Sequence, residues 1–145
     1  MAYTLLGVDA IDRAGVNNHG SSYLYVNYPA THNGIIKEVQ IFGNVAGSCR
    51  IKIYSDDGSN YVLERTSTEI DFGTGLTIIT GLWLPIRKGW YFGEYIVAGH
   101  QDAATSGGTQ KYINSEAGTL PKTDWSDGNY QDSIQAKVFT YCNII

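Results

Sequence analysis

The sequence has few charged residues, a single methionine and three prolines. Asp, Glu, Lys and Arg together make up only 17% of its 145 residues, and the net charge is −4. The ten Lys and Arg residues are scattered from Arg13 to Lys137 without a basic cluster, so nucleic acid is not expected as a partner. No apolar run approaches the about 20 residues of a membrane span, and no export signal follows Met1. We therefore expect a protein that has no membrane partner and is made in a cytoplasm, or else a chain that was trimmed before this numbering begins.

Helical periodicity is missing as well. No stretch of eleven residues keeps apolar positions at i, i+3, i+4 and i+7 without an interrupting Gly or Pro. Alternating apolar and polar residues recur instead, and the 17 Gly and 11 Tyr suit tight turns and half-buried strands. The clearest strands are expected at residues 22–28, 35–43, 49–54, 61–66, 90–97 and 133–141.

The segments between these strands predict turns and one unusual stretch. Asn44 to Ser48 is expected to turn the chain, and Ser55 to Asn60 is expected to form a hairpin loop around Gly58. The polar stretch from residue 99 to residue 132 is too long for a structureless loop, so we expect short strands near residues 110–114 and near Trp125.

The fold class follows from the number and spacing of these elements. About eight or nine strands with regular turns, and no helix to serve as a crossover, predict antiparallel pairing. We expect one domain, residues 1–145, folded as an all-β, antiparallel β-sandwich of the jelly-roll kind.

The two cysteines do not suggest a metal site. Cys49 and Cys142 each share the parity of apolar residues in their strands, so both thiols are expected to point inward. They could be two buried thiols or a disulfide, and the sequence leaves both open.

Short motifs along the chain resemble, in their order, a β-sandwich module of phage and metagenome-derived virion proteins. They cover about residues 9–141 and include Ile11-Asp12-Arg13-Ala14, Asn27-Tyr28-Pro29-Ala30, Gly34-Ile35-Ile36, Val39-Gln40-Ile41, Gly81-Leu82-Trp83-Leu84, Gly89-Trp90-Tyr91-Phe92-Gly93-Glu94-Tyr95 and Thr105-Ser106-Gly107-Gly108. The resemblance implies a jelly-roll-like module used in surface appendages, without an agreed enzymatic activity.

Catalytic motifs are not apparent. His19, His32 and His100 lie in expected turns or loops without a His or Cys at ligand spacing, and no Gly-x-Ser-x-Gly sequence occurs. Glu94 shares a strand face with Trp90, and it must be paired or shifted in pKa if that face is the core. If the opposite face of the strand is the core, Glu94 is instead exposed beside aromatic residues. We expect no enzyme, no cofactor and no metal.

Aromatic and acidic residues in the polar stretch provide the candidate binding site. Tyr112, Trp125 and Tyr130 lie near Asp124 and Asp127, and flat rings beside carboxylates suit sugar rings and protein anchors. The alternative is that the rings close the open end of the sandwich. Asp124, Asp127 and Asn129 could also hold Ca²⁺, although a plain turn around Gly128 explains them.

Tyr23 and Tyr25 form a second candidate, because two tyrosines on one face suit an interface between copies as well as a core. Together these observations predict a non-enzymatic structural protein of a virion or surface appendage, such as a capsid decoration, fibre or tail subunit. We expect a homo-oligomer that binds a capsid or fibre protein and resides in the virion after synthesis in the host cytoplasm. The alternative is a glycan-binding or receptor-binding module on an extracellular surface.

Overall fold

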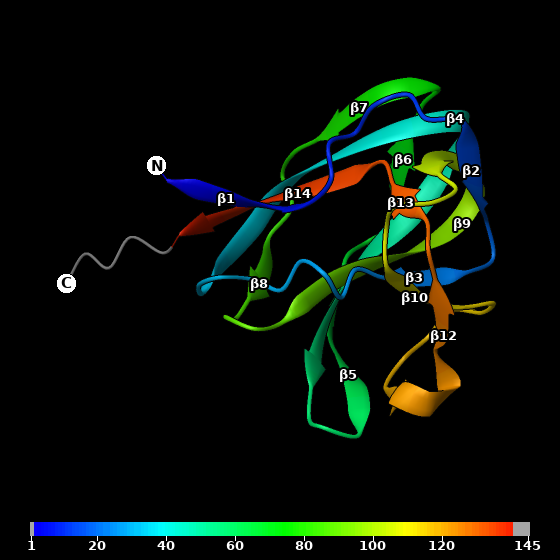
Figure 1. Ribbon diagram of the computed structural model, residues 1–145. Helices are drawn as coiled ribbons and strands as arrows, with labels where there is room; N and C mark the ends of the chain where they lie inside the picture. Colours follow the sequence, from blue (N-terminus) through cyan, green and yellow to red (C-terminus); the bar gives the residue numbers. More distant parts are fainter. Residues whose placement is uncertain (1, 141–145) are drawn as a thin grey trace.

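The computed structural model describes residues 2–140, and within them almost all regular structure is β-strand (Figure 1). The expected all-β antiparallel sandwich is confirmed, with fourteen strands among the described residues rather than eight or nine. The strands are β1 (Tyr3–Gly7), β2 (Gly15–Asn18), β3 (Ser22–Leu24), β4 (Gly34–Asp56), β5 (Asn60–Thr66), β6 (Ile70–Phe72), β7 (Gly75–Ile79), β8 (Leu84–Ile86), β9 (Tyr91–Ala104), β10 (Gln110–Ile113), β11 (Leu120–Pro121), β12 (Ser126–Gly128), β13 (Gln131–Asp132) and β14 (Ile134–Thr140), with a short 3-10 helix η1 (Lys122–Asp124).

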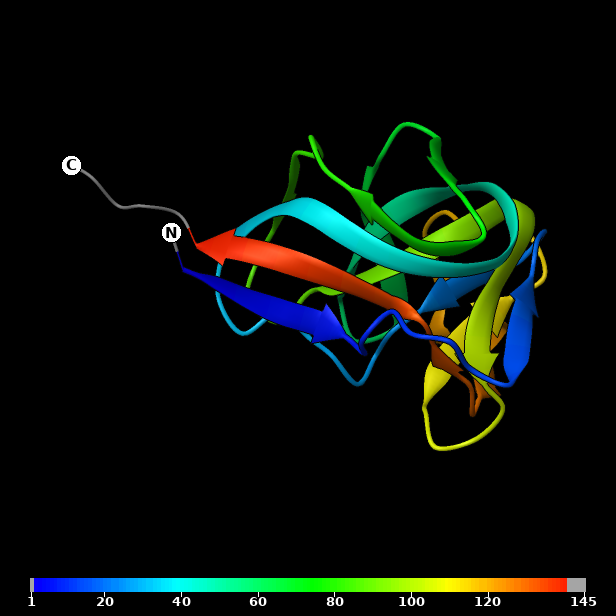
Figure 2. The same cartoon turned by 90° about the horizontal axis from the view of Figure 1, so that it is seen from above.

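Two layers share one strand. In the first sheet, β1 pairs with β14, β14 with the beginning of β4, and that part of β4 with β7 and β8. In the second sheet, the end of β4 lies between β5 and β9, and the order continues through β3 and β10 to β12. Figure 2 shows β1, β14 and the first part of β4 side by side, with β9 and β2 at the other end of the molecule. Every pairing is antiparallel.

The turn that we expected at Asn44–Ser48 is wrong, because β4 runs through it for 23 residues. The strand bends there instead, and its register with β9 shifts between Gly43 and Cys49. Glycine permits the bend: a Cβ at Gly47 would lie 1.9 Å from the carbonyl oxygen of Ala98 on β9. One strand thereby carries the chain from the first sheet into the second.

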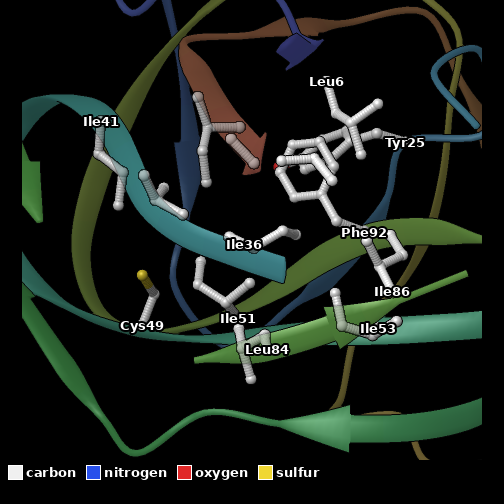
Figure 3. Packing of buried hydrophobic residues seen from close by; sticks show 14 of the residues in the cluster. Leu6, Tyr25, Ile36, Ile41, Cys49, Ile51, Ile53, Leu84, Ile86 and Phe92 are labelled. Carbon is white, nitrogen blue, oxygen red and sulfur yellow. The ribbon is translucent and has the colours of Figure 1, made fainter. Parts of the chain in front are cut away.

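The core lies between the sheets and follows the predicted alternation (Figure 3). Ile51, Ile53 and Cys49 of β4 are fully buried, as is Val138 of β14. Phe92 and Ile96 project into the same core from β9, so of the two alternatives for Glu94 the structure shows the inward-facing one. Cys142 lies outside the described residues, so the two alternatives, two buried thiols or a disulfide with Cys49, both stay open.

A second apolar cluster lies on the outer face of the second sheet. Tyr54 and Tyr61 pack there against Trp125 and Ala117, which come from the polar stretch after β10. The short strands expected in that stretch are confirmed as β10 and β12. The segment between them covers this face of the sheet.

The hairpin loop expected at residues 55–60 is also confirmed. Oδ1 of Asp57 accepts hydrogen bonds from the backbone N–H groups of Ser59 and Asn60, and Gly58 has φ of 100°. No helix in the described part of the chain is long and apolar enough to cross a membrane.

Candidate functional site

A surface pocket of about 310 Å³ lies where four parts of the chain meet. Strand β2 contributes Asn17, β3 contributes Tyr23, β10 contributes Tyr112, and the turn after β12 contributes Tyr130. The pairing of the strands fixes this arrangement, because Tyr112 lies directly opposite Tyr23 in the β10–β3 ladder. The volume of the pocket is at the lower end of the range for small-molecule sites.

The pocket lining is polar and nearly uncharged. Besides the three tyrosines it consists of Asn17, Asn18, Ser21, Gln110, Asn114, Asp127, Gly128 and Asn129. Its single formal charge is the carboxylate of Asp127, which is exposed and paired with the ammonium group of Lys111. The lining therefore offers amide and hydroxyl groups for hydrogen bonds, and no net attraction for a strongly charged ligand.

Two buried amides form part of this lining. Gln110 is 3% exposed, and its side-chain amide faces the carboxylate of Asp132. We orient this amide with its nitrogen toward Asp132, because the nitrogen then donates to both carboxylate oxygens at 2.6 and 2.9 Å. Asn17 is 2% exposed, and its amide helps to lower the pKa of Asp132. Its Nδ2 nonetheless has no partner in good hydrogen-bonding geometry among the described residues. Asp132 thus lies on the core side of these two lining amides.

Asp132 belongs to a buried acidic cluster that continues into the core. The hydroxyl of Tyr25 donates to Oε2 of Glu94 at 2.5 Å, and Nε2 of Gln101 donates to Oε1 at 2.6 Å. Burial raises the pKa of Glu94 from 4.5 to about 7, although the hydrogen bonds from Tyr25, Gln101 and Cys49 oppose this rise.

Burial has the same effect on Asp132. The pKa of this carboxyl is raised from 3.8 to about 7, mainly by burial and also by the charge of Glu94, while Asn17, Tyr25 and Arg13 oppose the rise. The pKa of Tyr25 is also raised, by burial and by Glu94. Two carboxyl groups and a tyrosine therefore share a dry environment that favours their neutral forms.

This acidic cluster does not open into a space of substrate size. Asp132 and Tyr25 touch a cavity of about 10 Å³, which is about the size needed for one water molecule. Glu94 is fully buried. The two carboxyl groups therefore do not flank a cleft in which a sugar ring could be hydrolysed.

The candidate residues from the sequence are divided between the pocket and the interior. Tyr112, Tyr130 and Asp127 line the pocket, as we expected for a shared site, and Tyr23 lines it with them. Tyr23 and Tyr25 are 7% and 5% exposed, so of the two alternatives for this pair, an interface between copies or the core, the tentative interface role is wrong and both rings are buried. Tyr25 instead packs on Phe92 in the core and binds Glu94.

Trp125 and Asp124 do not contribute to the pocket. Trp125 is only 5% exposed and makes edge-to-face contacts with Tyr54 and Tyr61, so its predicted role as a ligand platform is wrong. It closes the outer face of the second sheet, because its ring fills the space against β4 and β5. Asp124 is exposed on η1 and does not line the pocket.

Sequence reasoning missed the amides of the pocket. Asn17 and Gln110 lie in short strands far apart in the chain, and neither is part of a motif. Strand β2 was not expected at all, because Gly15 to Asn18 has a single apolar residue, Val16. The only signal was compositional, in the number of amides around Asn114 and Asn129.

A second surface feature is the outer face of the first sheet, which we call the open face. It carries Tyr3 and Leu5 on β1, Leu76 and Ile78 on β7, and Trp83 before β8, with exposures from 48% to 65%. Tyr3 and Trp83 are linked through the side chains of Phe139 and Lys37. The ring of Tyr3 lies 5.5 Å from that of Phe139, and Nζ of Lys37 lies 5.7 Å from Phe139 and 4.9 Å from Trp83.

Within residues 2–140, no group of three or more His, Cys, Asp or Glu side chains could hold a metal ion. In the described part of the chain, the fold and these surfaces define an all-β antiparallel sandwich with a polar pocket and a sheet face that no described segment covers. Comparison with family models, curated proteins and solved structures finds no match to this chain.

Proposed function

We propose that this protein is a non-enzymatic structural subunit of a virion or surface appendage, which assembles with further copies through its open face. The observation that carries the proposal is a difference between the two outer faces of the sandwich. The second sheet is covered by the segment that contains Trp125. Among the described residues, nothing comparable covers the first sheet, and five of the seven large apolar side chains that are most exposed lie there.

Such a surface suits a protein partner. Aromatic and aliphatic side chains are exposed over several strands of this sheet face. Contact between such an apolar surface and water is unfavourable, and surfaces of this kind mark interaction sites. Tyr and Trp are enriched at protein interfaces, because they combine a large apolar area with a polar group. Covering the open face with a protein partner is therefore favourable in free energy.

A second copy of the chain is the partner that its charges favour. Lys137 and Glu38 form an ion pair of 2.9 Å in the middle of the open face, and Lys37 lies beside Trp83. A face with both signs of charge can pair with itself about a two-fold axis, since each lysine then meets an acidic group. Strand β1 also favours pairing with a second copy. It pairs with β14 on one side and with no described strand on the other, so its free edge can accept another strand.

The place of the subunit in a virion rests on the resemblance of its motifs to virion modules. The acidic cluster supports a structural role, because its carboxyl groups are held in the core and do not flank a cleft. A capsid or fibre protein would be the further partner of the assembled subunits.

Light scattering after size exclusion tests the assembly. The native protein should be an oligomer, and Leu5→Lys combined with Ile78→Lys should dissociate it, since both positions are exposed and the substitutions bury no charge in the monomer. Val45→Lys is the matched control, because Val45 is 47% exposed but lies at the bend of β4. A native monomer at high concentration, or an oligomer that survives the double substitution, would overturn the proposal. Mass spectrometry of purified particles tests the virion assignment separately.

A further inference from the structure

We infer that the pocket formed by β2, β3, β10 and the turn after β12 binds a neutral saccharide. This inference does not rest on assembly through the open face, because the two surfaces share no residue. It concerns a recognition function that the assembled subunit would add to its structural one.

The charge of the pocket limits the class of ligand. No Lys or Arg lines it, so it lacks the groups that bind phosphate or carboxylate ligands. Its one carboxylate, Asp127, is already paired with Lys111, so it offers little to a cation. A neutral ligand with many hydrogen-bonding groups fits this lining, and a saccharide has that composition.

The hydrogen-bonding groups suit hydroxyls in particular. A hydroxyl group donates one hydrogen bond and accepts others, so it is best held by a donor and an acceptor placed together. Asp132 holds the amide nitrogen of Gln110, which leaves Oε1 of Gln110 as an acceptor. Asn18 and Asn129 are exposed in the same lining, and their side-chain amide nitrogens are donors. Ligand hydroxyls in the pocket could therefore pair with such a donor and with Oε1 of Gln110.

The walls of the pocket complete the match. Tyr112 and Tyr130 are half-buried, and Tyr23 lies beside Tyr112 across the β10–β3 ladder. Tyrosine rings combine an apolar face, which packs on the C–H groups of a sugar, with a polar hydroxyl. Asn129 and Asn18 are exposed and line the same pocket, where they can bind further hydroxyls.

The pocket is also built on rigid supports. The backbone N–H of Gly108 donates to the carbonyl oxygen of Asn129 at 3.1 Å, which holds the turn after β12. Ser21 donates to Oδ1 of Asn114 at 3.0 Å, which links the end of β10 to the start of β3. The amides are therefore positioned before a ligand arrives, and this lowers the entropic cost of binding.

Saturation-transfer NMR with a panel of methyl glycosides, followed by calorimetry on the strongest, tests the inference. The panel contains neutral hexosides, N-acetylhexosaminides and their disaccharides, with inorganic phosphate and choline as charged probes. We expect binding of at least one neutral saccharide and of neither charged probe.

Three variants locate the site. Asn129→Ala should weaken binding about tenfold, the effect of losing about one hydrogen bond. Asn18→Trp should abolish it by filling the pocket from an exposed position. Asn27→Ala is the matched control, because Asn27 is also an exposed asparagine but does not line the pocket.

Because these positions are exposed, thermal unfolding should stay unchanged in all three variants. The inference is overturned if no neutral saccharide binds at millimolar concentration, if a charged probe binds in its place, or if Asn18→Trp binds as the native protein does. The oligomeric state is measured on the same samples. An oligomer without saccharide binding would refute this inference alone, and a monomer that binds saccharide would refute only the proposed assembly.

Discussion

The hydroxyl of Tyr25 donates a 2.5 Å hydrogen bond to Oε2 of Glu94 inside the sandwich, where both side chains are buried. Asp132 lies in the same environment, and its charge and that of Glu94 raise the pKa of Tyr25. Such a cluster is stable while its carboxyl groups are protonated. It loses stability when they ionise, because the desolvated charges repel one another.

We predict that the protein is less stable at pH 8 than at pH 5. The folded-state pKa values of Glu94 and Asp132 are about 7, above their ordinary values of 4.5 and 3.8. The stability that these groups contribute is fully present below the ordinary values, and it is lost as the pH rises through 7. The loss should be of the order of 3 kcal/mol for each group. Urea denaturation at a series of pH values measures it.

Glu94→Gln is the corresponding control, because it keeps the shape and one hydrogen-bonding oxygen but cannot ionise. It should remove about half of the decrease between pH 5 and pH 8. The ion pairs that lower the pKa of Glu38, Asp56 and Glu116 act below pH 4.5, so they do not interfere in this range. Stability that is constant or rises from pH 5 to pH 8 would contradict the prediction.

Trp125→Ala should destabilise the fold by about 3–5 kcal/mol, because it leaves a cavity between Tyr54 and Tyr61 under the covering segment. Trp83→Ala removes an equally large ring that is 65% exposed in the single subunit, and it should change the stability of the isolated subunit by less than about 0.5 kcal/mol. Chemical denaturation of both variants gives the comparison. Equal effects would mean that Trp125 is not part of a packed cluster.

Gly93→Ala should disrupt the pairing of β3 with β9. A Cβ at this position would lie 2.2 Å from the backbone oxygen of Tyr23, which cannot move without breaking the ladder. We expect a loss of about 1–3 kcal/mol. Gly118→Ala is the control, because a Cβ there meets nothing within 4 Å and the backbone φ is not in the left-handed region. The melting temperatures of the two variants test this prediction. Similar values would refute the close approach of Gly93 to the backbone of Tyr23.

The thiol of Cys49 should resist alkylation in the native protein. It is fully buried, and its pKa is raised above 9.0 by burial and by the charge of Glu94. Thiolate is the reactive form, so the native rate with iodoacetamide at pH 8 should be far below the rate in denaturant. Peptide mapping by mass spectrometry measures modification at this residue. Rapid native labelling would show that the core opens there.

The fold could be predicted where burial alternates along a strand, and less well where it does not. Ile51, Ile53 and Val138 are in the core as expected, because a period of two leaves few alternatives. The bend of β4 was mistaken for a turn, since small residues such as Gly47 are typical of both. What distinguishes the two is the approach of Gly47 to Ala98, which depends on a distant strand.

The candidate site was predictable only in part. Tyr112 and Tyr130 could be chosen from composition, because aromatic rings stand out in a polar stretch. Trp125 satisfied the same criterion and was wrong, since composition does not tell which side of a sheet a ring will occupy. Asn17 and Gln110 gave no signal, because their importance arises from the buried carboxyl group of Asp132 between them and the core.

The pairing of β1 with β14 joins Tyr3 to Phe139, almost the full length of the described chain apart. During synthesis on the ribosome, β1 therefore has no partner until nearly all of that chain has emerged. The edge of β4 that receives β14 is also unoccupied during this time. Nascent chains thus expose two unpaired strand edges to each other and to chaperones, and crowded polysomes are where this protein is most at risk of aggregation.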